Sequence, residues 1–331
     1  MILALLVAFQ EPMFDGRSLA GWTAHGGGVY SVDDGSILGV TGTGEYGWLC
    51  SDRPYADFEL TLETKIEGTG NSGIQVRSRL GGETGIIGYQ FDLDRTRPSS
   101  GRLYDEGRRK LLMDVPWVPS KREAFKAGQW NEVRIRCEGD RLRSWVNGVP
   151  IVDDRDPADL EGVIALQVHS GKDARVRWRN LRIRDLGRHA WSRFDLSLGA
   201  CEAVGALEWK PEENVYHGEM KGSALSLLRT RRAYGDFTLR LVYRTEAGNV
   251  RLSFGAAEPD GLSGMRLGLL PSEAWRELVV SAHEGRVVAH QDGRRLLDVP
   301  SPDRPAGPIV LELLGPGARL QVKDVALLEK R

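Results

Sequence analysis

The residues that could do chemistry lie in four polar stretches in the first half of the chain. In order along the chain, these stretches read NSGIQVRS (71–78), GYQFDLD (88–94), GRLYDEGRRK (101–110) and LQVH (166–169). In three of them polar and apolar residues alternate, so a β-strand would present the polar residues on one face. If those strands are neighbours, one face of a sheet gathers Arg77, Gln90, Asp92, Gln167 and His169, and a loop rich in acids and bases at its edge contributes Tyr104, Asp105, Glu106 and Arg109.

Such a surface suits a sugar, because hydroxyl groups need hydrogen-bond donors and acceptors in fixed positions. It also contains carboxylates and an imidazole, which are common proton carriers in enzyme active sites. The alternative interpretation is structural, since the solvent-facing side of an antiparallel sheet routinely carries alternating polar residues. Each residue taken alone favours that interpretation, whereas their occurrence together favours a site.

The elements that must position these residues are strands. Alternation at period two runs through the chain, for example over residues 57–67, 130–138, 141–147 and 175–185, and helical periodicity is nearly absent. Asn147-Gly148 is a strong signal for a tight turn between two of these segments. The sequence therefore predicts an all-β fold, with a Greek-key or jelly-roll sandwich as its architecture.

The same order of signals recurs after residue 186. Phe14-Asp15 is matched by Phe194-Asp195, YADF (55–58) by YGDF (234–237), WNEV (130–133) by WREL (275–278), and Asn147-Gly148 by Asp292-Gly293. The apolar face changes parity between Trp178 and Leu181, and again at the corresponding place of the second copy, as a β-bulge would require. We therefore expect two tandem jelly-roll sandwiches over residues 13–187 and 188–331, the second shorter and degenerate.

The two copies differ in length where the polar stretches lie. Between Phe58 and Trp130 the first copy has 72 residues, whereas the second has 38 between the corresponding positions, a difference of 34. A segment that one copy folds without is not needed for the sandwich, so it is the first place to look for a site. The second copy also replaces LQVH by LELL and so lacks the imidazole, although Arg251 lies at or near the place of Arg77.

Net charge, cysteines and the N-terminus narrow the function classes further. A formal net charge of −1 gives no electrostatic reason to expect nucleic acid or an anionic membrane as a partner. The three cysteines lie far apart without a CxxC pair, so we expect buried thiols rather than a zinc site or a disulfide framework. Residues 2–9 are apolar but too few to cross a bilayer, and no other segment could span one. They fit the core of a signal peptide over residues 1–12, which predicts export to the periplasm or the medium; the alternative is an N-terminal strand.

Some signals point to no site. Residues 42–47 (GTGEYG) match the pattern GxGxxG, but a β pattern follows instead of a helix, so a nucleotide site is not expected there. Four histidines fall in turns or surface strands, where we expect them to be solvated: His25, His217, His283 and His290.

The polar stretches, together with WNEVRIRCEGDRLRSWVNG, GVIALQVHSG and RWRNLRIRDL, occur in the order typical of one family. Over about residues 13–187 the chain resembles the 3-keto-disaccharide hydrolase domain family. The resemblance implies a concanavalin A-like lectin/glucanase jelly roll. Many members read GYEVQI where this chain has GYQFDL, so it is similar to the branch reading GYQxDI and LYDExRR, and roles from the other branch do not transfer to Gln90.

The resemblance implies cleavage of glycosides already oxidised to a ketone at C3. Such a ketone acidifies the C2 proton, so a base can remove it and the C1 substituent can leave by elimination. The reaction needs a base near C2, an acid at the glycosidic oxygen, and a donor or cation for the enolate. We therefore expect His169, Glu106 and Asp105 as catalytic acids or bases, Arg77 and Arg109 as stabilisers that bind the substrate, and Gln90, Asp92, Tyr104 and Gln167 as ligands of sugar hydroxyls.

No cofactor is firmly implied, and the alternative is a divalent metal that polarises the ketone. Asp92, Glu106 and His169 could hold one, although no spacing demands it. The expected partner is an oligosaccharide or glycoside substrate, and no signal for an oligomeric state is present. Two other functions stay open: a non-catalytic carbohydrate-binding protein, and a structural or adhesive cell-surface protein. The acid/base residues in the segment unique to the first copy favour the enzyme.

Overall fold

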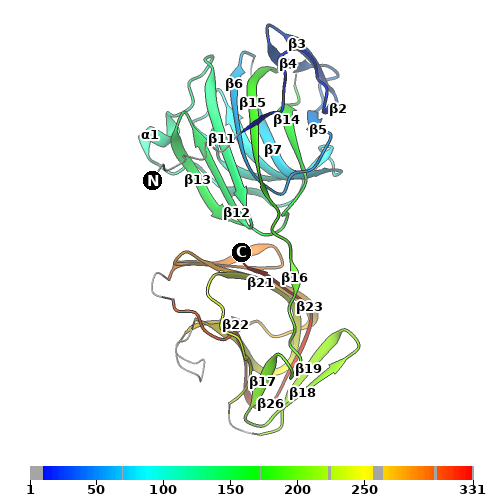
Figure 1. Cartoon of the computed structure of the whole chain (residues 1–331), viewed down its shortest axis with the longest axis vertical. Helices are drawn as coiled ribbons and strands as arrows, with labels where there is room; N and C mark the ends of the chain where they lie inside the picture. The colour runs from blue at the N-terminus through cyan, green and yellow to red at the C-terminus, as the bar shows by residue number, and fades with distance from the viewer. Residues whose placement is uncertain are drawn as a thin grey trace, which may run out of the picture. The chain divides into compact units, whose positions relative to one another are not determined.

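The computed structural model describes residues 10–329 except residues 69, 172, 223–224, 256–263 and 302–303. The chain divides into two compact units, and the boundary in the sequence lies between His189 and Ala190 (Figure 1). The residues of the predicted signal peptide up to residue 9 lie outside the described part. Glu11 and Pro12 form a short strand, β1, on the first unit, so that unit begins before residue 13. In the described part, no helix is long and apolar enough to cross a membrane.

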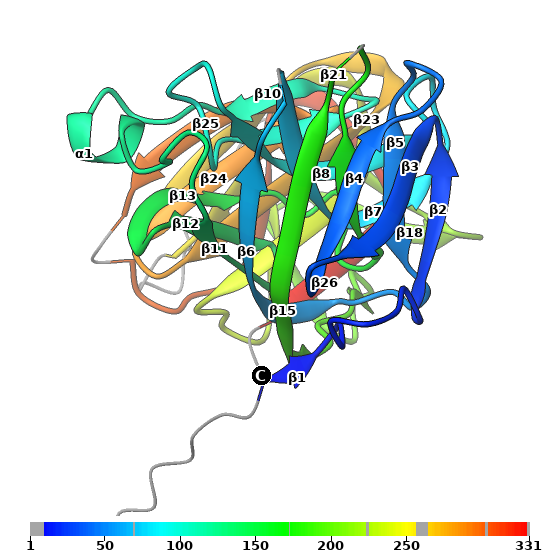
Figure 2. The ribbon, with the colours of Figure 1, turned by 90° about the horizontal axis from the view of Figure 1, so that it is seen from above.

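The first unit consists of two antiparallel sheets. The outer sheet has the order β13 (Val149–Arg155), β12 (Arg141–Val146), β11 (Asn131–Glu138), β6 (Asp57–Ile66), β15 (Arg175–Gly187), β4 (Ser36–Thr41) and β3 (Gly28–Asp33), and β1 pairs with β15. Figure 2 shows β15 flanked by β6 and β4. These are the strands in which alternation was strongest, and the unbroken register between β6 and β11 follows from it.

The second sheet of the first unit carries the polar stretches. Its order is β10 (Lys110–Met113), β9 (Leu103–Glu106), β8 (Ile86–Asp94), β7 (Asn71–Leu80), β14 (Val163–Val168), β5 (Gly47–Ser51) and β2 (Trp22–Gly26). A single short helix, α1 (Pro119–Arg122), follows β10 in the described part of this unit.

The core of the first unit lies between its two sheets. Apolar residues at every second position of β6 face apolar residues at every second position of β7 and β8, among them Phe58, Leu60, Ile74, Tyr89 and Phe91, all fully buried. Burying one such side chain stabilises a fold by roughly 1.5–3 kcal/mol. The alternate positions of β7 and β8 are therefore forced onto the opposite face of the second sheet, which is where their polar residues lie.

The second unit uses the same strand order with fewer strands. Its strands are β16 (Ser192–Arg193), β17 (Cys201–Val204), β18 (Leu207–Glu212), β19 (Val215–Met220), β20 (Ser226–Thr230), β21 (Phe237–Phe254), β22 (Met265–Leu269), β23 (Ser272–His283), β24 (Arg286–Gln291), β25 (Arg294–Pro300) and β26 (Val310–Glu329). The path β25-β24-β23-β21-β26-β19-β18 repeats the outer sheet of the first unit, and β22-β21-β26-β20-β17 repeats β8-β7-β14-β5-β2. Within the described residues, nothing in the second unit corresponds to β9 and β10.

The predicted fold class is confirmed: the chain is all-β, with two jelly-roll sandwiches of which the second is the smaller. The predicted bulge between Trp178 and Leu181 is present as a shift of register between β15 and β6, with Asn180 in the left-handed region at φ 55°. The corresponding bulge of the second unit has Asp324 at φ 49°. The three cysteines are free and buried, as expected.

Candidate functional site

The candidate site lies on the side of the second sheet that faces away from the core, which we call the polar face. Strand pairing places its side chains in rows across the sheet. One row contains Gln75, Gln90 and Tyr104, because Gln75 pairs with Gln90 and Gln90 with Tyr104. The next row contains Gln167 on β14 and Asp92 on β8. Neighbouring strands thus bring together residues that are up to about a hundred positions apart in sequence.

A chain of hydrogen bonds crosses the polar face. Ser78 Oγ donates to Gln75 Oε1 over 2.6 Å, Gln75 Nε2 to Gln90 Oε1 over 3.0 Å, and Gln90 Nε2 to Asp92 Oδ1 over 2.6 Å. Arg102 Nε donates to the other Asp92 oxygen over 2.7 Å. Each amide therefore has a fixed orientation, and the floor of the site is rigid before any ligand binds.

Gly73 makes this floor possible. A Cβ at Gly73 would lie 2.3 Å from Cδ of Gln90, so the Gln90 amide occupies the space that a side chain on β7 would need. Any larger residue at this position would push the amide away from Asp92 and break the chain of hydrogen bonds.

Gln167 presents an unused hydrogen-bond acceptor. Its side chain is only 1% exposed, and within the described residues its Oε1 has no hydrogen-bond partner. It pairs across the sheet with Trp48, whose Nε1 donates to the Thr84 carbonyl over 2.7 Å and is thereby occupied. A buried acceptor without a partner is costly, because it has lost its hydrogen bonds to water and gained none in the fold.

His169 follows β14 and has a defined tautomer. Its Nδ1 lies 2.9 Å from the Ser170 carbonyl oxygen, which can only accept, so Nδ1 carries the proton. The Nε2 atom is then free to accept a proton, and the hydroxyl of Tyr46 lies 3.5 Å from it. The Tyr46 and His169 rings are in edge contact, with centroids 4.9 Å apart. The arrangement places the imidazole Nε2 at the rim of the polar face, where it can exchange a proton.

Glu106 is a buried carboxyl group with a raised pKa. Burial raises the pKa of its carboxyl above the ordinary value, the nearby charge of Asp92 raises it further, and Thr84 and His169 oppose the shift. Burial also raises the pKa of Asp92, against the effect of Gln90 and Arg102. Since the charges of Asp92 and His169 both shift the pKa of Glu106, the two carboxyl groups and the imidazole lie close enough to interact electrostatically.

Six of the nine residues expected from the sequence lie on the polar face or at its rim. Glu106 is 9% exposed, and the other five are buried or half-buried: Gln90, Asp92, Tyr104, Gln167 and His169. The pKa of the Tyr104 hydroxyl is raised by burial and by the charges of Glu106 and Asp92.

Arg77 is not part of this arrangement, contrary to the expectation. A bulge in β7 shifts the register between Val76 and Arg79, with Arg77 at φ 48°, so the alternation breaks at this residue. The buried guanidinium donates to the carbonyl oxygens of Ala56 and Gly139 and pairs with Asp57 over 2.8 Å. These contacts give Arg77 a structural role between strand ends.

Asp105 and Arg109 also belong to a structural network, which corrects the roles assigned to them. Asp105 lies next to Glu106 on β9 and therefore points to the opposite side of the sheet. It is fully buried and pairs with Arg108 over 2.7 Å and with Arg109 over 2.5 Å. Arg109 continues to Asp156 over 2.7 Å. This network fixes the turn between β9 and β10 and leaves Asp105 no access to a substrate on the polar face.

Several residues of the site were missed by sequence reasoning. Tyr46 lies in the glycine-rich stretch that resembles a nucleotide motif, and Tyr46, Trp48 and Cys50 alternate with the buried Leu49. That alternation is the signal that could have identified them. His25, expected to be solvated, is half-buried on β2 opposite Trp48. The expectation was also wrong for two histidines of the second unit, since His283 and His290 are each only 6% exposed.

The side chains proposed as metal ligands do not form a metal site. In the described part of the chain, no three His, Cys, Asp or Glu side chains are arranged so that they could hold a metal ion. Asp92 has both oxygens engaged by Gln90 and Arg102. Asp92, Glu106 and His169 therefore do not provide the ligand set that the sequence left open.

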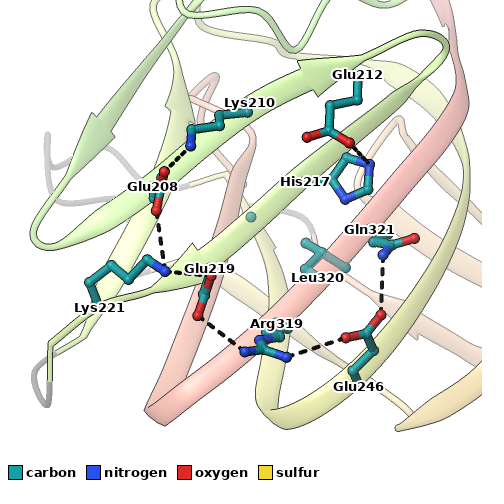
Figure 3. A pocket seen from close by; sticks show the side chains of 11 residues that line it. Glu208, Lys210, Glu212, His217, Glu219, Lys221, Glu246, Arg319, Leu320 and Gln321 are labelled. Atoms are coloured by element: carbon teal, nitrogen blue, oxygen red, sulfur yellow. Dashed lines mark hydrogen bonds and ion pairs between the residues drawn. The ribbon is translucent and has the colours of Figure 1, made fainter.

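A groove of about 370 Å³ in the second unit has a different character (Figure 3). Lys221 bonds both Glu208 and Glu219, and Arg319 lies within ion-pair distance of Glu219 and Glu246. Lys221 holds the pKa of Glu219 below its ordinary value, so this carboxylate is ionised and cannot serve as an acid near neutral pH. The groove is an exposed ladder of compensated charges rather than a second proton-transfer site.

The chain is similar to proteins of known family and structure. A family described as 3-keto-alpha-glucoside-1,2-lyase-like domain matches residues 10–184. No curated protein sequence matches. A carbohydrate-binding module, CBM66 from Bacillus subtilis, is 17% identical with a TM-score of 0.42 over 50% of this chain and 96% of its own. A putative glycosyl hydrolase from Parabacteroides distasonis is 20% identical with a TM-score of 0.40 over 54% and 100%. A protein of unknown function with a galectin-like fold from Bacillus subtilis is 16% identical with a TM-score of 0.42 over 54% and 94%.

Proposed function

Because the chain belongs to the family of 3-keto-alpha-glucoside-1,2-lyase-like domains, we propose that its first unit cleaves glycosides that carry a ketone at C3. The observation that carries the proposal is the pairing on one face of a base, His169 Nε2, with a carboxyl group whose pKa is raised, Glu106. A group that takes a proton and a group that gives one in the same site are what an elimination needs.

In the proposed reaction, His169 removes the proton from C2, and the electron pair is delocalised onto the C3 ketone as an enolate. The pair then forms the double bond between C1 and C2, and the bond from C1 to the glycosidic oxygen breaks. Glu106 donates its proton to the leaving oxygen, so the sum of the charges is unchanged. Water can add to the double bond afterwards, which would make the overall reaction a hydrolysis.

The enolate oxygen needs donors, and Arg77 and Arg109 are engaged elsewhere. We assign this role to the hydroxyl groups at the rim of the polar face, those of Tyr46 and Tyr104. Gln90 and Asp92 form the floor under the sugar ring, and the buried Gln167 lies beside them in the same sheet.

The test is to incubate the purified full chain with 3-keto-trehalose and with a 3-keto-glucoside, each with and without EDTA. We expect release of the aglycone or second sugar under both conditions. Absence of release under both would contradict the enzyme and leave the carbohydrate-binding protein, which binding of the unoxidised glycoside would then support. Loss of release in EDTA alone would show that a metal is required.

We also propose that the chain is exported, on the basis of the apolar residues 2–9. Cell fractionation combined with N-terminal sequencing of the mature protein tests this. An intact N-terminus in the cytoplasmic fraction would contradict it.

A further inference from the structure

Trp117 is an aromatic side chain held in a fixed orientation in water. It lies between β10 and α1, and its side chain is 86% exposed. The Arg122 guanidinium stacks on one face of the indole at 3.5 Å from its centroid, and Arg122 Nη2 donates to the Val115 carbonyl over 3.1 Å. Val115 is a core residue, so this contact ties the pair to the body of the unit. One face of the ring is therefore covered and the other faces solvent.

A groove adjoins this ring. It has a volume of about 410 Å³ and lies between the loop that follows β8, residues 94–98, and the segment 122–129. Arg122 lines the groove and also stacks on Trp117, so the indole ring lies next to the groove. Arg97, Glu123 and Gln129 supply donors and acceptors along the groove.

The groove borders one end of the polar face. The loop 94–98 begins at Asp94, which pairs with Asn71 at the first residue of β7. Leu166 pairs with Ile74, so the antiparallel register continues to bring His169 to the level of Asn71. His169 and the groove are thus at the same end of the second sheet, on the strands β14 and β8 that flank β7.

We propose that Trp117 and this groove form an outer subsite for a further sugar ring of an oligosaccharide. The C–H groups of a pyranose face carry partial positive charge and pack on the negative face of an indole, and the hydroxyl groups at the ring edge need the donors and acceptors of the groove. A protein partner fits less well, because the large apolar side chains that are exposed here, in the described part of the unit, are Leu111, Trp117 and Val118. A stable protein interface buries roughly 800 Å² on each partner.

This inference deepens the proposed function, since the reacting sugar would occupy the polar face and the rest of the same chain would reach Trp117. Its consequence is a substrate preference for oligosaccharides over single glycosides with a small aglycone. It can be tested without any reaction, because an unoxidised oligosaccharide would bind to the outer subsite.

The experiment is calorimetric titration of the full chain with maltotetraose, cellotetraose, laminaritetraose and glucose. We expect at least one tetrasaccharide to bind more tightly than glucose. Trp117→Ala should weaken that binding about tenfold, and Trp117→Phe less, since a smaller ring remains. The matched control is Trp145→Ala. Trp145 on β12 of the outer sheet is also stacked by an arginine, Arg134 at 3.9 Å, and its loss should leave the affinity unchanged.

Three outcomes would overturn the subsite: tetrasaccharides that bind no better than glucose, equal binding by Trp117→Ala and the wild type, or a change of oligomeric state in Trp117→Ala detected by light scattering without a change in sugar affinity. The proposed reaction fails separately. If neither the wild type nor any variant cleaves a 3-keto-disaccharide while Trp117→Ala still loses tetrasaccharide binding, the subsite stands and the enzyme does not.

Discussion

The two units of this chain have the same strand order and very different polar faces. In the first unit Leu166 pairs with Ile74, and in the second Leu311 pairs with Leu252. This register equates Gln167 with Glu312. The core positions keep their apolar character in both units, whereas the side chains on the opposite face change freely.

The changes in the second unit remove the features of a sugar site. Glu312, at the place of Gln167, is 1% exposed, and its Oε1 accepts a hydrogen bond from Ser253, whereas Gln167 Oε1 has no partner among the described residues. The same register equates Arg251 with Gly73, which corrects its expected place beside Arg77. The second unit also has no described counterpart of β9, the strand that carries Tyr104 and Glu106. Both jelly rolls keep their core, and the proposed chemistry would use a hairpin that only the first unit has among the described residues.

The comparison predicts first that substitutions of proton-carrying side chains lower the activity only when they lie on the polar face of the first unit. His169→Ala and Glu106→Gln should each lower kcat for a 3-keto-glycoside by about 10²–10⁴-fold. Two controls should stay within twofold of the wild type: His217→Ala in the groove of the second unit, and Glu83→Gln, an exposed carboxylate next to Thr84. Equal losses in the controls would contradict the assignment of the chemistry to the polar face.

A second prediction concerns the hairpin that distinguishes the units. Asp105→Ala removes the buried carboxylate that Arg108 and Arg109 share and leaves each with one other partner, Asp159 and Asp156, so it should lower the free energy of unfolding by about 3 kcal/mol. Asp298→Ala, which breaks an exposed pair with Arg286 in the second unit, should cost about 1 kcal/mol or less. Urea denaturation measures both. A small loss for Asp105→Ala would reopen the question of a catalytic Asp105.

The unused acceptor of Gln167 gives a third prediction. Gln167→Leu removes an acceptor that is buried out of reach of a ligand, so KM and kcat should both stay within about twofold of the wild type. Folding should not suffer, because an unpaired buried amide is replaced by an apolar side chain of similar size, and stability should stay equal or rise by about 1 kcal/mol. A loss of stability in thermal denaturation would mean that the acceptor is already satisfied.

The smallest expected effect is a difference in pH dependence between the two units. The pKa of Glu106 is raised in the folded chain, so the native state keeps the proton to a higher pH than the unfolded state does. The free energy of unfolding therefore falls as pH rises through the window between the ordinary and the raised pKa of this carboxyl. Glu106→Gln should remove this loss and be relatively more stable above the window. The pKa of Glu219 is lowered, so the stability that its ionised carboxylate contributes is lost as pH falls through the lowered pKa. Glu219→Gln should therefore change the stability on the acidic side of the pH profile. Denaturation at a series of pH values would detect either sign, and equal slopes would refute the contrast.

The fold could be predicted because alternation and repetition are properties of the backbone pairing itself. Residues such as Gln90, Asp92 and Gln167 lie on strands whose alternation is unbroken, so their side was predicted correctly. The prediction for Arg77 was wrong because a bulge reverses the alternation, and nothing in NSGIQVRS indicates that this residue has a left-handed backbone conformation. The prediction for Asp105 was wrong because its segment was expected to be a loop. The segment is strand β9, in which neighbouring side chains point to opposite faces of the sheet.

Tyr46 and the hydrogen bonds of His169 depend on a different kind of information. They arise where β5 and β14 pair, more than a hundred residues apart in sequence, and no local pattern contains that register. The roles of Glu106 and Asp92 depend on burial, which the alternation predicts only as a side of the sheet. Local sequence thus identifies candidates, and the tertiary pairing decides among them.

The long strands β21 and β26 have a consequence for biosynthesis. Each runs through both layers of the second unit, and they pair with each other along most of their length. The second unit therefore cannot assemble its central pairing until β26 has left the ribosome. The first unit has its last strand, β15, complete by Gly187 and can fold while the remainder is being translated. The part of the chain with the candidate site can thus form before the second unit has left the ribosome.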